Sequence, residues 1–148
     1  MTDAARTLLV AAVLCVVAAA TFVARLRRHE PESHERLIGE LRAANAAALL
    51  LGATGAATIG FTLTSGAATA ALELALALLI IGVAGVLFTR APREALRWCA
   101  IAFLAHAFLD LGHRPGWLST DLFPRSYLIG SALYDGCVAG LCFLARQR

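Results

Sequence analysis

The sequence predicts an all-α integral membrane protein, a bundle of five transmembrane helices with its N-terminus outside and its C-terminus in the cytoplasm. Of the 148 residues, 59% are hydrophobic, whereas soluble domains contain about 45–50%. The chain divides into five apolar segments of membrane-spanning length, and its basic residues gather on alternate sides of them. The length suits one domain that covers residues 1–148.

The five apolar segments have helical lengths. A helix needs about 20 apolar residues to cross the hydrocarbon core, with roughly 17–25 tolerated. Spanning segments must also satisfy their backbone hydrogen bonds internally, which favours helices. The predicted helices cover residues 7–24, 43–64, 67–88, 95–111 and 127–145.

Local signals support the limits of these segments. The first one is followed rather than preceded by arginines, so we interpret it as a retained helix and not as a signal peptide. A very short turn at 64–68 predicts that the second and third helices are antiparallel neighbours. Pro92 suits the start of the fourth helix, and Gly112 with Pro115 suits its end. The loop 29–35, with two His and three Glu, is interpreted as solvated.

The arginines predict the orientation. The chain has 13 basic residues and no lysine. Cytoplasmic loops of membrane proteins carry an excess of such residues. Ten arginines fall on one side of the five predicted helices, and three fall on the other, namely Arg6, Arg114 and Arg125. We therefore expect a multi-pass protein of the cell membrane, in contact with the lipid bilayer. The net charge of +3 is too small and too scattered to indicate a nucleic-acid partner.

Small residues indicate where helices approach one another. The second helix carries Gly52, Gly55 and Gly60, and the fifth carries Gly136 and Gly140 in a GxxxG pattern. Close approach of small residues supports helix association in lipid. The Gly136/Gly140 pattern is compatible with a contact inside the bundle, with a homo-oligomer or with a larger membrane complex. The four cysteines form no CxxC motif and are interpreted as small buried hydrophobic residues.

Ionisable residues in the apolar segments mark a candidate site, because such groups are costly at membrane depth. His106, Asp110 and His113 lie within about 60° on one helix face. With a rise of about 1.5 Å per residue, Glu73 lies roughly 8–9 Å and Asp135 roughly 12 Å below the outer surface. His106 lies about 8–10 Å below the same surface. Three helices thus place acids or histidines in the outer half, which predicts a shared pocket.

Three interpretations of these residues remain open. In the first, His106, Asp110 and His113, joined by Glu73 or Asp135, bind a divalent metal, with Zn, Fe or Mn as candidates. In the second, the carboxyl groups act as acid and base in an apolar pocket. In the third, the polar groups pair with one another and only stabilise the bundle. Haem is not expected, because His106 has no second histidine at similar depth.

The preferred functional hypothesis is a small membrane enzyme with an outward-opening polar pocket. It would act on a lipophilic small molecule (an isoprenoid, sterol, quinone or lipid) by acid/base or metal-assisted chemistry. The expected catalytic residues are His106, Asp110, Asp135 and Glu73, and the expected substrate-binding residues are His113, Arg114, Tyr134 and Trp117. The alternatives are a non-catalytic accessory or anchoring subunit of a membrane complex and a small transporter.

Overall fold

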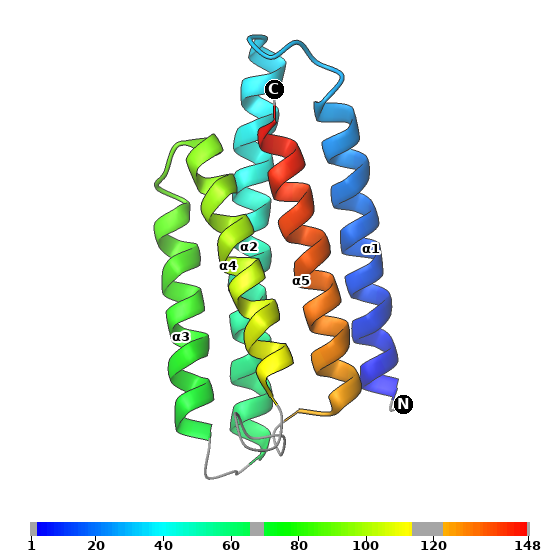
Figure 1. The fold of residues 1–148 in the computed structure, drawn as a ribbon, viewed down its shortest axis with the longest axis vertical. Helices are drawn as coiled ribbons and strands as arrows, with labels where there is room; N and C mark the ends of the chain where they lie inside the picture. The colour runs from blue at the N-terminus through cyan, green and yellow to red at the C-terminus, as the bar shows by residue number, and fades with distance from the viewer. Residues whose placement is uncertain (1–2, 66–69, 114–122, 148) are drawn as a thin grey trace.

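The computed structural model describes residues 3–65, 70–113 and 123–147, and all regular secondary structure in these ranges is helical. The five helices follow one another along the chain and alternate in direction (Figure 1). They are α1 (Asp3–Leu26), α2 (His34–Ser65), α3 (Ala70–Leu87), α4 (Pro92–Gly112) and α5 (Arg125–Arg146).

The helices pack as a bundle with α4 and α5 as its closest pair. Helix α2 packs along both α3 and α4, and α1 packs mainly against α5. Figure 1 shows α3 at one edge of the bundle and α1 at the other. The N-terminus and the C-terminus lie at opposite ends, as an odd number of alternating helices requires.

Helix α2 begins nine residues earlier than expected. Its 32 residues span about 48 Å, more than the roughly 30 Å of a hydrocarbon core. The Ser33 hydroxyl accepts a hydrogen bond from the Arg36 backbone N–H at 3.2 Å and caps the first turn. The polar stretch from His34 to Arg42 is therefore helical, where a longer loop had been expected.

The surface of the bundle is apolar and its interior contains the polar exceptions. Leu63, Phe108 and Leu133 are 67–73% exposed, whereas Asp135 is fully buried. Within the described residues, four helices (α1, α2, α4 and α5) are long and apolar enough to cross a membrane, and α3 is a shorter apolar helix. An apolar surface around buried polar groups is the reverse of the arrangement in soluble proteins and fits a membrane protein.

The glycines of α2 and α5 differ in how closely other helices approach them. A Cβ on Gly55 would lie 2.8 Å from Ile81 Cγ1 and 2.9 Å from the Ala77 carbonyl oxygen, so α2 and α3 approach closely there. A Cβ on Gly60, Gly136 or Gly140 would meet nothing within 4 Å. The GxxxG pattern of α5 is therefore not a contact inside the bundle.

The core lies between α2, α4 and α5 and is centred on Leu51, Phe103 and Cys99. Cys142 is also buried there, as expected, but Cys15 and Cys137 are exposed on the apolar surface. The thiols that had been interpreted as buried hydrophobic residues thus divide between the core and the lipid-facing side.

Candidate functional site

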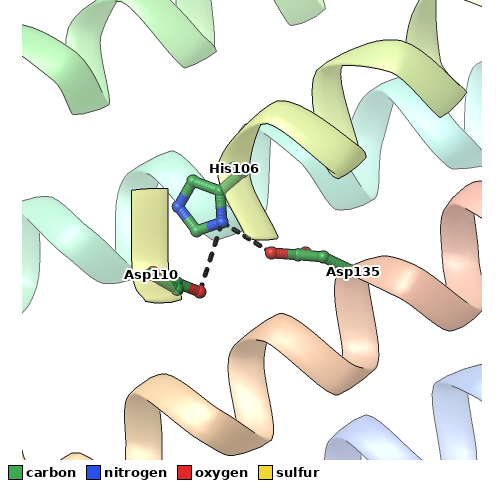
Figure 2. A group of neighbouring side chains, drawn as sticks. All are labelled: His106, Asp110 and Asp135. Atoms are coloured by element: carbon green, nitrogen blue, oxygen red, sulfur yellow. Dashed lines mark hydrogen bonds and ion pairs between the residues drawn. The ribbon is translucent and has the colours of Figure 1, made fainter. Parts of the chain in front are cut away.

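Three side chains from the paired helices α4 and α5 meet inside the bundle (Figure 2). His106 Nδ1 lies 2.6 Å from Asp135 Oδ2 and 3.6 Å from Asp110 Oδ2. His106 and Asp110 are four residues apart on α4, which places them one turn apart on the same face. The predicted proximity of His106 and Asp135 is confirmed.

The short His106–Asp135 distance requires a proton between the two atoms, because both would otherwise present lone pairs. Figure 2 shows the second nitrogen of the imidazole directed away from both carboxyl groups. His106 therefore uses one nitrogen toward the two acids and keeps Nε2 for another partner.

Two carboxyl oxygens of this cluster lack hydrogen-bond partners within the described structure, namely Asp110 Oδ2 and Asp135 Oδ1. Asp110 is 6% exposed, and Ser131 of α5 lies near its carboxyl group. A buried polar atom without a partner costs about 1–3 kcal/mol. Such atoms in a native fold therefore call for a functional or structural explanation.

A second histidine–acid pair lies one to two turns further along α4. His113 Nε2 is 3.0 Å from Glu73 Oε1, and His113 Nδ1 donates to the Leu109 carbonyl oxygen at 2.9 Å. Both nitrogens of His113 are thus engaged. His113 had been expected to share a metal with His106 and Asp110, but the structure pairs it with Glu73 instead.

A small cavity of about 20 Å³ connects the two histidine–acid pairs. A cavity needs roughly 10–15 Å³ to hold one water molecule, so this one has room for a single water. Its wall includes both histidines, Glu73 and Asp110, and apolar or hydroxyl-bearing side chains complete it: Thr58, Leu76, Ala77, Ile80, Leu109, Phe123 and Tyr127.

Aromatic rings cover one end of this cavity. Phe123 stacks on Tyr127 with ring centroids 5.8 Å apart and meets the edge of His113 at 5.6 Å. Phe61 packs against both Phe123 and Tyr127. Phe123 is buried over His113.

The remaining predicted residues lie elsewhere. Tyr134 packs against Phe103 with ring centroids 6.4 Å apart and lines an apolar groove, not the polar cavity. Arg114 and Trp117 lie outside the described residues. Tyr127, which had not been predicted as a site residue, lines both the polar cavity and the groove.

Two apolar grooves flank α1, where it leans on α2 and α5. One has a volume of about 430 Å³ and lies toward the C-terminal end of α5. The other has about 320 Å³ and lies beside the polar cluster; we call it the α1 groove. Its walls include Leu9, Cys15, Thr54, Ala57 and the α5 residues Tyr127, Ser131 and Tyr134. Tyr127 and Ser131 therefore separate this groove from the His106–Asp110–Asp135 cluster.

A further buried polar network, at the opposite end of the bundle, was missed at the sequence level. Glu40 is 1% exposed and binds Arg36 Nε at 3.0 Å and Arg93 Nε at 2.8 Å. Arg36 also donates to the carbonyl oxygens of Leu26, Ala145 and Gln147 at 2.7–3.0 Å. The Arg36 guanidinium thus joins the C-terminal ends of α1 and α5, where carbonyl groups lack helical partners.

No protein-family model, no curated protein and no solved structure matches this chain.

Proposed function

We propose that this protein is a small integral membrane enzyme whose His106–Asp110–Asp135 cluster acts on a lipophilic substrate. The observation that carries the proposal is the position of this buried cluster directly behind the α1 groove, with Ser131 and Tyr127 between them. An ionisable cluster at membrane depth is costly, and its two buried oxygens without protein partners support a role for it beyond stability.

Of the polar cavity and the α1 groove, only the groove is large enough for such a substrate. The polar cavity of about 20 Å³ is too small for an isoprenoid, sterol, quinone or acyl chain. The α1 groove, with about 320 Å³, reaches the lower end of the range for ligand pockets, about 300–1,000 Å³. The chain of the substrate would lie in the groove and its polar end against Ser131 and Tyr127.

Proton transfer or metal assistance is the chemistry that these side chains support. Ser131 lies near Asp110 and lines the groove, and its hydroxyl can both donate and accept a hydrogen bond. Asp135 fixes the ring of His106 on the other side at 2.6 Å. Glu73 and His113 line the same cavity and would exchange protons with the cluster through one water.

Cross-linking tests whether the groove binds a lipid chain. Purified protein in nanodiscs would be irradiated with a diazirine-bearing, alkyne-tagged farnesol, and the modified peptides would be mapped by mass spectrometry. We expect saturable labelling of α1 and α2 peptides that line the groove, and loss of labelling in Ala57→Trp, which fills it. Ala56→Trp, one position away and outside the groove, is the matched control. Equal labelling of the two variants would contradict the proposal.

Turnover separates an enzyme from a binding protein. Incubation with a panel of isoprenoid alcohols, quinones and sterols, followed by mass spectrometry, should reveal a product with the native chain. Asp110→Asn should abolish that product while farnesol cross-linking persists. Cross-linking without turnover of any panel member would favour a lipid-binding accessory protein.

A non-catalytic subunit is the second candidate function. Gly136 and Gly140 lie on the exposed side of α5, where a Cβ added to either would meet nothing within 4 Å in the described residues, which favours an external partner helix over an internal contact. We propose this face for self-association or for docking in a membrane complex. Replacing both glycines by leucine should then reduce association in detergent or lipid without changing the melting temperature.

A further inference from the structure

We infer that the His106–Asp110–Asp135 cluster binds one divalent transition-metal ion, with Zn²⁺ as the probe of choice. The inference deepens the proposed function, since it concerns the same cluster. It narrows the ligand set expected from sequence, which was His106, Asp110 and His113 joined by Glu73 or Asp135: Asp135 stays, and His113 is left out because it pairs with Glu73.

The ligand atoms of the three residues already converge. In the described part of the chain, they form a buried group whose potential ligand atoms all lie within 4.8 Å of one another. Figure 2 shows both carboxyl groups facing the same side of the imidazole, around Nδ1. One imidazole nitrogen and two carboxylate oxygens form a donor set that suits zinc, iron or manganese.

The spacing of the ligand atoms requires adjustment. Ligands at about 2.0–2.2 Å from a tetrahedral ion lie roughly 3.3–3.5 Å apart. The 3.6 Å between His106 Nδ1 and Asp110 Oδ2 is near that value, whereas the 2.6 Å between Nδ1 and Asp135 Oδ2 is a hydrogen bond. The ion would therefore replace the proton between His106 Nδ1 and Asp135 Oδ2. The distance between these two atoms would increase by less than about 1 Å.

Charge favours an ion of charge +2. Two carboxylates beside a protonated imidazole leave one net negative charge in the bundle, but a divalent ion with a neutral imidazole leaves none. The ion would also give a partner to Asp110 Oδ2, a buried oxygen that has none. Uncompensated charge in an apolar interior is costly. An ion of charge +2 is therefore favoured, because it balances the two carboxylates.

The environment resembles that of catalytic rather than structural zinc sites. Structural sites are closed by four protein ligands, whereas catalytic sites have three and keep a position for water. Here the cluster supplies three, and the adjoining cavity of about 20 Å³ has room for one water beside Glu73 and His113. His113 uses both ring nitrogens for Leu109 and Glu73, so it contributes no direct ligand.

Metal analysis of the purified full chain, with any affinity tag removed, tests the inference. After dialysis against Zn²⁺ and then against metal-free buffer, we expect one zinc per chain by mass spectrometry of the elements. Asp110→Asn and His106→Gln should weaken zinc binding by more than about 100-fold, beyond the range for loss of an outer-sphere partner. His113→Gln, on the same helix and outside the cluster, should bind zinc as the native chain does.

Two results of the zinc measurement would overturn the inference. Zinc below a tenth of an equivalent in the native chain, or equal loss in His113→Gln and Asp110→Asn, would overturn the inference. Asp110→Asn is the key variant because Asp110 makes no hydrogen bond to His106, so its fold is expected to persist, and circular dichroism would verify this. Farnesol cross-linking is scored separately. Cross-linking without zinc binding would leave the proposed function in place without the metal. Zinc binding without cross-linking would leave the metal site in place and contradict binding of a lipid chain in the groove.

Discussion

Asp110 and Asp135 flank the same ring nitrogen of His106 but should differ in their contribution to stability. Asp135 makes the 2.6 Å hydrogen bond, whereas Asp110 Oδ2 is 3.6 Å away and has no hydrogen-bond partner. Breaking a buried pair by removing one partner costs about 3–5 kcal/mol. Asp135→Asn should therefore lower the free energy of unfolding by that amount, and Asp110→Asn by less than about 1 kcal/mol.

Thermal unfolding of both variants in the same detergent measures this difference. A loss of stability in Asp110→Asn as large as that in Asp135→Asn would make Asp110 a structural partner of His106. That result would favour the interpretation in which the polar groups only hold the bundle together.

The helical rise, which converts residue number into height, was sufficient to predict that His106, Asp135 and Glu73 gather in one region of the bundle. It was not sufficient to divide them into two pairs. The partner of a buried side chain depends on how each helix is rotated about its axis, and packing across the bundle decides this. His113 was accordingly expected with His106 but pairs with Glu73, and Tyr134 was expected in the polar pocket but faces the groove.

Arg36 illustrates a residue whose role is invisible in sequence. It lies just after a polar loop, yet it is 3% exposed because the ends of α1, α2 and α5 meet around it. Its guanidinium uses Nε and both terminal nitrogens. A lysine has a single ammonium group and cannot reproduce this planar arrangement.

Arg36→Lys should therefore destabilise the protein by about 3–5 kcal/mol, as expected when a buried charge pair loses a partner. Arg90→Lys is the control, because Arg90 and Glu94 form an exposed pair at 3.6 Å, and such pairs contribute about 0–1 kcal/mol. Chemical unfolding followed by circular dichroism would compare the two. Equal stability of both variants would show that the Arg36 contacts add nothing to the fold.

At the scale of elements, the contact of α2 with α3 depends on Gly55. An added Cβ would lie 2.9 Å from the Ala77 carbonyl oxygen, and this backbone atom cannot move alone. Gly55→Ala should therefore cost about 1–3 kcal/mol, the usual range for overpacking. Gly85→Ala, on α3 with nothing within 4 Å of the new Cβ, should be neutral or stabilising by up to about 1 kcal/mol.

Melting temperatures of the two glycine variants give the comparison directly. A Gly55→Ala protein as stable as the native chain would mean that α3 is free to move away from α2. Since Glu73 is on α3 and His113 is on α4, such mobility would also loosen the second histidine–acid pair.

The ends of the helices were predictable where an apolar segment or a proline marked them. The start of α4 at Pro92 agrees with the proline signal, within three residues of the predicted apolar segment. The start of α2 does not, because its first turns carry charged residues that hydropathy assigns to a loop. Those turns are helical since Ser33 caps them and since Arg36 and Glu40, one turn apart, bind each other.

At the scale of the whole molecule, the two polar networks lie toward opposite ends of one apolar bundle. The Arg36–Glu40–Arg93 network joins helix ends near the loop 27–33 and the turn 88–91, at the end that carries the C-terminus (Figure 1). The histidine–acid cluster lies toward the other end. The first network has the paired charges of a structural element, and the second retains buried oxygens without partners.

Because the two networks lie at opposite ends of the bundle, the orientation of the protein in the membrane decides which side of the membrane the histidine–acid cluster is closer to. The arginine distribution predicts that the end with the loop 27–33 is cytoplasmic. Single cysteines at exposed positions would test this in a chain whose native cysteines are replaced by alanine (Cys15, Cys99, Cys137 and Cys142). Glu32→Cys and Thr89→Cys mark one end, and Arg125→Cys marks the other.

In intact cells, a membrane-impermeant maleimide should label Arg125→Cys and leave Glu32→Cys and Thr89→Cys unmodified. All three should react once the membrane is permeabilised, which controls for their accessibility. Because the two loops lie at the same end of the bundle (Figure 1), Glu32→Cys and Thr89→Cys must behave alike if the helices cross the membrane as drawn. Labelling of Glu32→Cys from outside would reverse the orientation and place the His106–Asp110–Asp135 cluster toward the cytoplasm. Labelling of Thr89→Cys but not Glu32→Cys from outside would mean that α3 does not cross, and the count of five spanning helices would then be wrong.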